Sequence, residues 1–330
     1  MPAARSAPAP PPRPAPRDGA RGALDCRGRT LDARPGAGLV MGVLNVTPDS
    51  FSDGGRYATV RAAVDRAAQM ADEGAAVVDV GGESTRPGAA PVGADEETAR
   101  VVPVVEAIAR EVPGLLVSVD TTKGAVARAA LRAGAHLVND VAGGADTAEA
   151  AAEWGAPLVV MHALGATGGA APADAYGDVV ADVAAALERA AARAEAAGVR
   201  DVVVDPGFGF GKSVADNLRL VAGLDRLAAA GRPVLVGVSR KSTVGAVLAR
   251  AGRGGRGGHP APVSERLYGS LGLAALAVVR GAAIVRVHDV RATVETLCTL
   301  TAALDAGGAD AGGADAGGAD AGGAGAEGGR

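Results

Sequence analysis

The sequence predicts a single α/β domain folded as a (β/α)8 barrel, the TIM-barrel class. Eight short apolar runs alternate with stretches of helical composition between residues 22 and 304. Runs that are apolar throughout are typical of strands buried on both faces, as in a parallel sheet. A chain of this length is normal for one such barrel. A doubly wound open sheet has the same order of elements, so it remains the alternative.

The predicted strands are rich in Val, Leu and Ala, and the stretches between them are predicted to be helices. The strands cover residues 39–44, 76–80, 115–119, 135–138, 157–161, 201–204, 233–238 and 282–287. The helices include residues 59–73, 95–110, 123–132, 178–197, 214–229 and 264–280. Several of them close at a glycine, the residue most often found just beyond a helix C-terminus: Gly74, Gly134, Gly198, Gly231 and Gly281.

Both ends of the chain have the composition of disordered tails. The first 16 residues hold seven prolines and no apolar segment typical of a secretory signal, and we expect residues 1–21 to be disordered. From Asp305 the chain repeats Asp-Ala-Gly-Gly-Ala four times, which predicts a flexible low-complexity tail over 305–330. The folded domain between the tails therefore occupies residues 22–304.

The overall composition excludes several classes of function. The formal net charge is −4, which gives the chain no electrostatic reason to bind nucleic acid. No apolar run approaches the length of a membrane span. The two cysteines, Cys26 and Cys298, lie far apart and predict neither a disulfide framework nor a cysteine zinc site, so we expect a cytoplasmic protein.

A bias toward Ala, Gly, Arg and Pro makes the remaining residue types informative. The chain has 30 arginines but only three lysines, three asparagines and three phenylalanines. Arg can replace Lys on most surfaces, so the few residues that the bias has spared are candidates for specific roles. Most of them lie in motifs directly after predicted strands.

Polar clusters follow all eight predicted strands. Because ligands bind at the carboxyl ends of the strands in both candidate architectures, these clusters predict one site. They are Asn45-Val-Thr-Pro-Asp-Ser-Phe51, Gly81-Gly-Glu-Ser-Thr-Arg-Pro-Gly88, Asp120-Thr-Thr-Lys123, Asn139-Asp140, Met161-His162, Asp205-Pro-Gly-Phe-Gly-Phe-Gly-Lys212, Ser239-Arg-Lys241-Ser242 and Arg286-Val-His288-Asp289.

These motifs, in this order, resemble the dihydropteroate synthase family of pterin-binding enzymes. The likeness runs from about Leu24 to Thr299 and rests on MGVLNVTPDSFSDGG, DVGGESTRPGA, VSVDTTK, VND, DPGFGFGK, VGVSRKS and RVHDV. The resemblance implies a TIM barrel that joins (7,8-dihydropterin-6-yl)methyl diphosphate to 4-aminobenzoate, giving 7,8-dihydropteroate and diphosphate. It also implies Mg2+ as cofactor, a homodimer, and inhibition by sulfonamides, which resemble 4-aminobenzoate.

The resemblance assigns the pterin to five residues. Asp120, Asn139 and Asp205 form the floor of the pocket, Lys241 donates to the ring, and Met161 packs against its face. A carboxylate can accept two N–H bonds from an aminopyrimidinone edge, and an amide can both donate and accept, so these residue types suit the ligand.

The diphosphate and the metal are assigned to Asn45, Arg286 and His288. Arg286 and His288 alternate along the last strand and can point the same way, since side chains repeat every second residue. Arg offers a planar fork to phosphate oxygens. Mg2+ prefers oxygen ligands and keeps several waters, so Asn45 can be its one protein ligand.

The resemblance places 4-aminobenzoate between two loops and the start of a helix. Ser242 opens the helix after the seventh strand, where free N–H groups favour a carboxylate. Phe51 belongs to the loop after the first strand, and Thr85, Arg86 and Pro87 belong to the loop after the second.

The expected reaction is an SN1-like displacement without a covalent enzyme intermediate. The catalytic residues are then Asp120, Asp205 and Lys241, which orient the substrates and stabilise charge on the pterin after diphosphate leaves. The aniline is a fair nucleophile by itself, so no Ser–His or Cys–His pair is needed.

The sequence also bears on alternatives to the synthase. The segment Gly207–Ser213 is not a P-loop, because Pro206 stands where the first glycine is required, and it is one residue short of a dinucleotide fingerprint. A folate-dependent methyltransferase domain would not need Arg286 and His288. A non-catalytic pterin-binding paralogue should lack some of the motif residues. His162, Lys212 and Asn217 receive no role from the sequence.

Overall fold

The computed structural model describes residues 22–47, 55–84, 90–164 and 175–313. Eight parallel strands lie in the order β8-β7-β6-β5-β4-β3-β10-β9, and a bridge between Val204 and Val234 joins the two outer strands. The sheet is thus a nearly closed barrel, and each predicted apolar run overlaps one strand. The strands are β3 (Leu39–Asn45), β4 (Val77–Gly81), β5 (Leu116–Asp120), β6 (Leu137–Asp140), β7 (Leu158–Met161), β8 (Val202–Asp205), β9 (Leu235–Val236) and β10 (Ile284–Val287). The predicted (β/α)8 barrel is confirmed.

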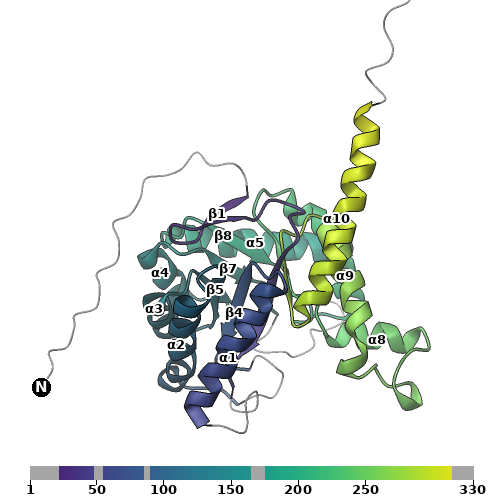
Figure 1. The fold of residues 1–330 in the computed structure, drawn as a ribbon. Coiled ribbons are helices and arrows are strands. Elements are labelled where there is room, and N and C mark those ends of the chain that lie inside the picture. The colour runs from purple at the N-terminus through teal and green to yellow at the C-terminus, as the bar shows by residue number, and fades with distance from the viewer. Residues whose placement is uncertain (1–21, 48–54, 85–89, 165–174, 314–330) are drawn as a thin grey trace, which may run out of the picture.

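Helices connect successive strands and surround the barrel (Figure 1). They are α1 (Gly55–Asp72), α2 (Ala94–Glu111), α3 (Gly124–Ala133), α4 (Ala145–Trp154), α5 (Val179–Ala196), α6 (Val214–Ala222), α7 (Leu224–Ala228), α8 (Ser242–Arg250), α9 (Leu267–Val279) and α10 (Val290–Gly313). The predicted stretch 214–229 divides at Gly223 into α6 and α7. The stretch 264–280 starts in the 3-10 turn η3 (Val263–Glu265) and continues as α9; another 3-10 turn, η2, spans Arg256–Gly258.

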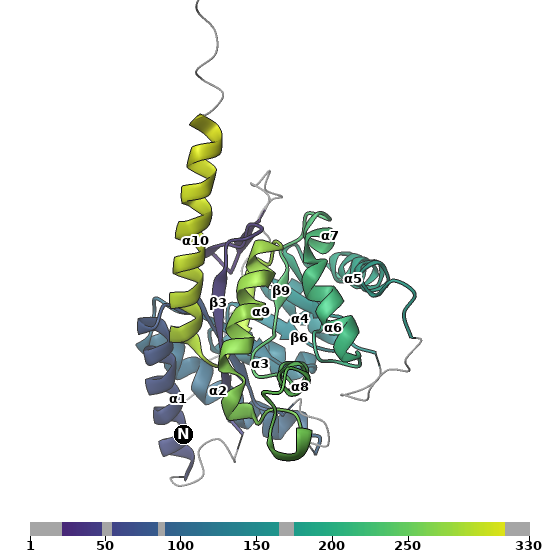
Figure 2. The ribbon, with the colours of Figure 1, turned by 90° about the vertical axis from the view of Figure 1, so that its right-hand side faces the viewer.

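Helix α10 leaves the body of the molecule and runs to Gly313, within the segment that the sequence assigns to the C-terminal tail (Figures 1 and 2). Residues 1–21 and 314–330, also assigned to the tails, lie outside the described residues.

A short antiparallel hairpin closes the amino-terminal end of the barrel, and the sequence did not predict it. Its strands are β1 (Ala23–Asp25) and β2 (Thr30–Asp32), each only three residues long. Leu24 and Leu31 are buried against the lower barrel residues. At the turn, the Arg29 guanidinium donates to the carbonyls of Pro113, Gly114 and Leu115. The hairpin is fixed by both apolar burial and charged hydrogen bonds.

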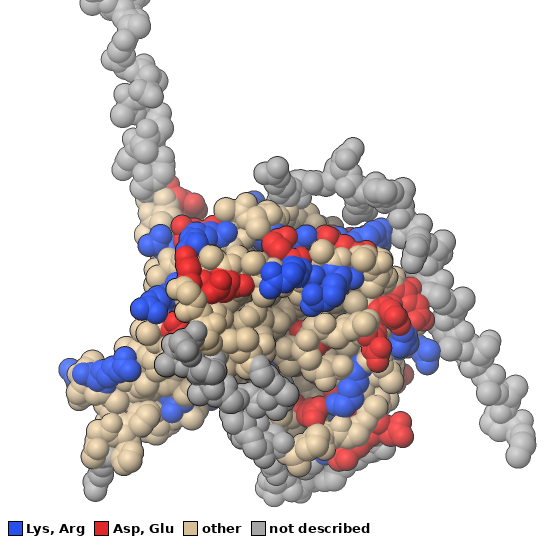
Figure 3. Space-filling view, turned by 180° about the vertical axis from the view of Figure 1, so that it is seen from behind, with Lys and Arg blue, Asp and Glu red and all other residues tan. Residues whose placement is uncertain are grey.

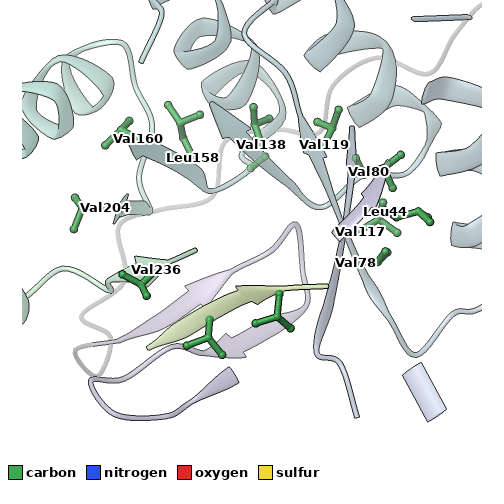
Figure 4. Packing of buried hydrophobic residues seen from close by; sticks show 14 of the residues in the cluster. Leu44, Val78, Val80, Val117, Val119, Val138, Leu158, Val160, Val204 and Val236 are labelled. Carbon is green, nitrogen blue, oxygen red and sulfur yellow. The ribbon is translucent and has the colours of Figure 1, made fainter. Parts of the chain in front are cut away.

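Alternate residues of each strand face outward and pack beneath the helices. Val78, Val80, Val117 and Val119, on two neighbouring strands, belong to the larger apolar cluster (Figure 4). Strands covered on both faces are apolar throughout, which is why the sequence shows runs and not alternation.

The interior of the barrel changes from apolar to polar over two residues on most of its strands. The lower layer contains one apolar side chain from every strand, namely Met41, Val77, Leu116, Leu137, Val159, Val203, Leu235 and Ile284. Two positions further along, the residues are Val43, Asp79, Ser118, Asn139, Met161, Asp205, Gly237 and Arg286. Because side chains on one face of a strand recur every second residue, this second layer lies directly above the first. Polar groups are therefore gathered at the carboxyl end of the barrel.

The surface carries both signs of charge. On the face shown in Figure 3, acidic and basic side chains are interspersed, with no broad basic field. Within the part of the chain that the structure describes, no helix is both long enough and apolar enough to cross a membrane.

Candidate active site

Strand register brings four motif segments side by side at the mouth of the barrel. Asn45 is opposite Gly81, Gly81 is opposite Asp120, and Asp120 is opposite Asn139. On the other side of the barrel, Met161 is opposite Asp205. Asn45, Gly81, Asp120 and Asn139 thus form a row across four strands, and Met161 and Asp205 form a second pair on two further strands.

Arg286 forms the centre of a buried ion network. Its Nε lies 2.6 Å from Asp79 Oδ2 and its Nη2 lies 2.6 Å from Asp120 Oδ2. The Asn139 amide also donates to Asp79 Oδ2, at 2.9 Å. Asp79 is fully buried, and it links the cation predicted to bind diphosphate to the amide predicted to bind pterin.

The network shifts the pKa of both Asp120 and Arg286. Burial raises the pKa of Asp120 to about 7; Arg286 opposes this rise, and Asp79, Glu97 and Asp140 add to it. Burial also disfavours the charged form of Arg286, but Asp79 and Asp120 more than offset this and raise its pKa above the usual value. The guanidinium therefore stays charged while Asp120 is poised near neutral pH.

Asp205 and Lys241 face the same space from the opposite side. Asp205 Oδ1 accepts the Gly207 N–H at 2.7 Å. Lys241 Nζ donates to the Phe208 carbonyl at 2.7 Å and lies 4.0 Å from the centre of the Phe210 ring, in a cation–π contact.

Burial is the main influence on both charges. It raises the pKa of Asp205, although the Gly207 N–H and Lys241 oppose the rise. It lowers the pKa of Lys241 to about 7; Asp205 and Asp120 oppose this, while Arg286 and Lys212 add to it.

The turn before Lys241 is held in an unusual backbone conformation. Arg240 has φ 58°, in the left-handed region that non-glycine residues rarely adopt. Its N–H donates to Ser270 Oγ at 2.9 Å, its carbonyl accepts from Arg266 at 2.9 Å, and its guanidinium pairs with Asp289. These contacts fix the turn that brings Lys241 to the pocket.

His288 lies above Arg286 at the end of β10. Its ring Nδ1 and its backbone N–H both lie 3.2 Å from Ser239 Oγ. Ser239 is buried and orients this histidine, a role that was not predicted from the sequence.

The structure brings seven of the predicted residues to a single pocket. The pocket encloses an empty volume of about 440 Å³, which includes space open to the solvent. The predicted residues that line it are Asp120, Asn139, Met161, Asp205, Lys241, Arg286 and His288. Phe210 and Ser239 line it as well.

The remaining predicted residues lie at the rim or outside the described part of the chain. Asn45, half-exposed, ends β3, and Ser242 is exposed as the first residue of α8. Phe51 and the segment 85–87 (Thr85, Arg86 and Pro87) lie outside the described residues.

Asp79 is a site residue that the sequence analysis missed. The available signal was a single acid within the apolar run AVVDV, because a charge inside a strand buried on both faces requires a partner. Phe210 belongs to one of the sequence motifs, but the sequence predicts no role for it. Only the path of its loop brings the ring beside Lys241.

The surroundings of Asn45 suit a hard cation. A Cβ placed on Gly81 would lie 3.6 Å from Asn45 Oδ1 and 3.7 Å from Asp120 Oδ2. Both oxygens therefore lie near Gly81 at the pocket mouth, where Asp120 Oδ2 is also paired with Arg286. In the described part of the chain there is no group of three or more His, Cys, Asp or Glu side chains that could hold a metal, so a cation here would depend on few protein ligands.

Buried acids, an amide and two cations gather at the mouth of the barrel, above an apolar layer. Such a pocket suits a flat, polar heterocycle with an anionic substituent. Residues 41–288 match the model of the pterin binding enzyme family, and the chain belongs to that family. Within it, the chain is a member of the dihydropteroate synthases, which are transferases. It is 46% identical to dihydropteroate synthase of Escherichia coli K12 over 271 residues, 81% of this chain and 92% of the relative.

Solved structures agree with this assignment. Dihydropteroate synthase of Xanthomonas albilineans with 4-aminobenzoic acid is 45% identical, with a TM-score of 0.75 over 86% of this chain and 99% of that one. The same enzyme in complex with 7,8-dihydropteroate gives 43% identity and a TM-score of 0.72 over 86% and 98% of the two chains.

Proposed function

We propose that this chain condenses (7,8-dihydropterin-6-yl)methyl diphosphate with 4-aminobenzoate in the pocket at the barrel mouth, releasing diphosphate. The observation that carries the proposal is the arrangement of Asp120, Asn139 and Asp205 opposite Lys241 and Arg286 around one space. A folate-dependent methyltransferase is not favoured, because it would not need Arg286 and His288, which we assign to a departing anion.

In this proposal the pterin lies over Met161 with its polar edge on the three floor residues. One oxygen of Asp205 is held by Gly207, so the second can accept from the pterin. Asn139 is oriented by Asp79, which fixes the direction of its carbonyl. Lys241 donates to the ring from the side.

The diphosphate lies against Arg286 and His288. Among the described residues, two of the five N–H groups of Arg286 bond to Asp79 and Asp120, so the rest of the fork can bind phosphate oxygens. The two carboxylates orient the guanidinium and keep it charged.

The reaction then depends on orientation and charge. As the bond from the methylene carbon to diphosphate breaks, positive charge develops on the pterin, and the carboxylates of Asp120 and Asp205 stabilise it. The amine of 4-aminobenzoate, whose carboxylate binds at the first turn of α8 near Ser242, attacks the methylene carbon and loses a proton.

Mg2+ is proposed as the cofactor, with Asn45 as its protein ligand. When bound it neutralises charge on the diphosphate and so favours its departure. We expect Asn45→Ala to raise the Mg2+ concentration needed for half-maximal activity by about tenfold, while excess Mg2+ restores much of the rate. The measurement is a Mg2+ titration of the steady-state rate. A titration curve identical to that of the wild type would contradict this assignment.

A homodimer is proposed through the exposed face of α9. Tyr268, Gly272, Leu276 and Val279 are all exposed and follow the helical period. The Tyr268 side chain is 83% exposed, which is costly for an apolar stripe on a free monomer. A second copy, related by a two-fold axis, would cover the same stripe on both subunits.

Two further features are proposed from the same assignment. Sulfonamides should compete with 4-aminobenzoate, because they share its aniline and its acidic group. Cys26 and Cys298 are free thiols, which fits a reducing compartment such as the cytoplasm.

The test is a coupled assay with the purified protein, Mg2+, the dihydropterin diphosphate and 4-aminobenzoate. We expect diphosphate release that requires 4-aminobenzoate, together with formation of 7,8-dihydropteroate. Pterin binding without turnover would instead indicate a non-catalytic paralogue.

A further inference from the structure

We propose that Lys212 is a positioning residue: its buried ammonium group fixes the glycine-rich loop after β8 on which Lys241 rests. The inference deepens the proposed function, on which it rests, because Lys241 is assigned there to the substrates. Neither the motifs nor the proposed chemistry gives Lys212 or its neighbour Asn217 a role.

Lys212 binds backbone and not substrate. Its Nζ donates to the carbonyls of His162 at 3.0 Å, Gly207 at 2.9 Å and Phe210 at 3.1 Å. An ammonium has three N–H groups, so all of them are engaged. Lys212 is 8% exposed, and its hydrogen bonds go to these carbonyls. Burial lowers the pKa of Lys212 to about 8, whereas the more distant Asp205 and Asp216 raise it. A buried charge held mainly by carbonyl dipoles is costly, which indicates a specific role.

Asn217 completes the support from the other side. Its Oδ1 accepts the Gly209 N–H at 2.7 Å, and its Nδ2 donates to the Lys212 carbonyl at 3.3 Å and to Thr243 Oγ1 at 3.1 Å. Asn217 lies on α6 and Thr243 on α8, directly after Ser242. The loop is thereby tied to both helices that flank it.

The glycines of this loop permit a path that passes very close to its supports. Gly207 and Gly209 both have positive φ, at 67° and 83°. A Cβ on Gly207 would lie 1.8 Å from the His162 carbonyl oxygen, and one on Gly209 would lie 2.7 Å from Lys241 Cδ. The Gly-x-Gly-x-Gly pattern therefore serves packing against Lys241 and β7, not the binding of a nucleotide.

The conformation of the loop determines the position of the Lys241 ammonium group. Phe208, whose carbonyl accepts from Lys241 Nζ, and Phe210, whose ring lies beside it, stand on either side of Gly209. Both lie within the segment that Lys212 and Asn217 hold. A change at Lys212 should move the two groups that place the Lys241 ammonium.

Charge gives a second link between the two lysines. The charged groups that face Lys241 are Asp205 on β8, Asp120 on β5, Arg286 on β10 and Lys212 on the loop. The two acids raise the pKa of Lys241, whereas Arg286 and Lys212 lower it. Without the charge of Lys212, the pKa of Lys241 should rise above about 7.

The low lysine content makes a direct measurement practical. The chain has only Lys123, Lys212 and Lys241, so protein labelled with ¹³C at the lysine side chains gives three signals to follow by NMR. Lys123→Arg and Lys212→Met each remove one signal and assign the third. The titration needs no turnover, so it is separate from the assay of the proposed function.

Three variants separate charge, geometry and general stability. Lys212→Met should raise the pKa of Lys241 and lower kcat/KM for both substrates by about 10- to 100-fold. Lys212→Arg keeps the charge, but a planar guanidinium cannot direct N–H groups at all three carbonyls. It should leave the Lys241 titration near that of the wild type and still lower kcat/KM.

Ser213→Ala is the matched control. It removes the side-chain cap of α6, one residue after Lys212, and so destabilises the same region without touching the three carbonyls. It should change neither the titration of Lys241 nor kcat/KM. If Lys212→Met does not fold, Thr243→Val, which removes one bond to Asn217, should lower kcat/KM in the same direction by a smaller factor.

The inference is overturned if the Lys241 signal titrates identically in Lys212→Met and the wild type, or if Ser213→Ala produces the same loss of kcat/KM. A wild-type protein that forms no dihydropteroate would contradict the proposed function instead.

Discussion

At the scale of single residues, each buried charge of the site lies next to an opposite charge, an aromatic ring or carbonyl groups. Asp79 and Asp120 pair with Arg286, Lys241 lies between Asp205 and an aromatic ring, and Lys212 is enclosed by carbonyls. A desolvated charge interacts strongly with its neighbours, so substitutions here should change both affinity and pH dependence.

Lys241→Ala should weaken the binding of both substrates, because Lys241 lies between the positions proposed for them. Loss of hydrogen bonds from a charged group predicts a rise of about tenfold or more in KM for each substrate. The measurement is steady-state kinetics with each substrate varied in turn. Arg226→Ala, which breaks an exposed pair with Asp178, is the control and should have no effect. Unchanged KM values in Lys241→Ala would refute the assignment.

The pterin site should lose affinity as the pH falls through about 7, where Asp120 becomes protonated. Only the carboxylate can accept from two N–H groups, so the ionised form binds more tightly. The negative charge of Asp79 raises the pKa of Asp120, and therefore Asp79→Asn should shift the loss of affinity to lower pH. Calorimetry with an unreactive pterin on both sides of this range measures the effect.

Asp65→Asn, which removes an exposed acid on α1, is the control for that experiment. It should reproduce the wild-type pH profile. A pterin affinity that is constant across the range, or a midpoint that Asp79→Asn moves upward, would show that Asp120 does not govern binding.

At the scale of elements, the strands position the site and the amino-terminal hairpin closes the barrel beneath it. The β1–β2 hairpin contributes Leu24, Cys26, Leu31 and Ala33 to the cluster that fills the barrel floor. The polar layer stands directly above this cluster. The hairpin should accordingly affect stability more than catalysis.

Leu24→Ala should lower the free energy of unfolding by about 2–5 kcal/mol, the usual cost of truncating a buried leucine. The kcat of the protein that remains folded should be unchanged, because no hairpin residue lines the pocket. Chemical denaturation measures the first quantity and active-site-normalised kinetics the second. The exposed Thr30→Ala on the same hairpin is the control. A loss of kcat with unaltered stability would contradict this division of roles.

At the scale of the whole molecule, helix α9 has an apolar face that is exposed. Figure 2 shows α9 facing outward between α8, α6 and α10. Its sequence, LYGSLGLAALAVV, is apolar almost all round, as expected for a helix covered on both sides. One side packs on the barrel, and a second subunit is the proposed cover for the other.

Leu276→Glu should convert the dimer to a monomer, because it places a charge in the centre of the proposed interface on both subunits. Sedimentation at several concentrations measures the mass. Arg128→Glu on α3, across the barrel from α9, should leave the dimer intact (Figure 1). A wild-type protein that sediments as a monomer at all concentrations would reject the dimer, and an unaffected Leu276→Glu dimer would reject this face.

Much of the architecture and of the pocket could be predicted from the sequence. Strands buried on both faces leave continuous apolar runs, and the ends of every barrel strand were predicted to within two residues. The largest relative difference is at β9, where only Leu235 and Val236 of the run 233–238 form strand. Seven predicted site residues line one pocket because strand ends meet at one end of any parallel barrel. The hairpin could not be predicted, because three-residue strands carry no periodic signal.

The barrel, the family and the identity of most polar groups at the barrel mouth can be predicted from the sequence alone. These follow from local patterns, which depend on residue type and spacing along the chain. Which of these groups are in contact depends on the tertiary structure. It shows that Asp79 orients Arg286 and Asn139, and that Ser239 contacts His288. It also shows that Lys212 holds the loop beneath Lys241. The physical reason is that hydrogen bonds and burial, and hence pKa values, depend on distances of a few ångströms between residues far apart in the chain, which no local pattern records.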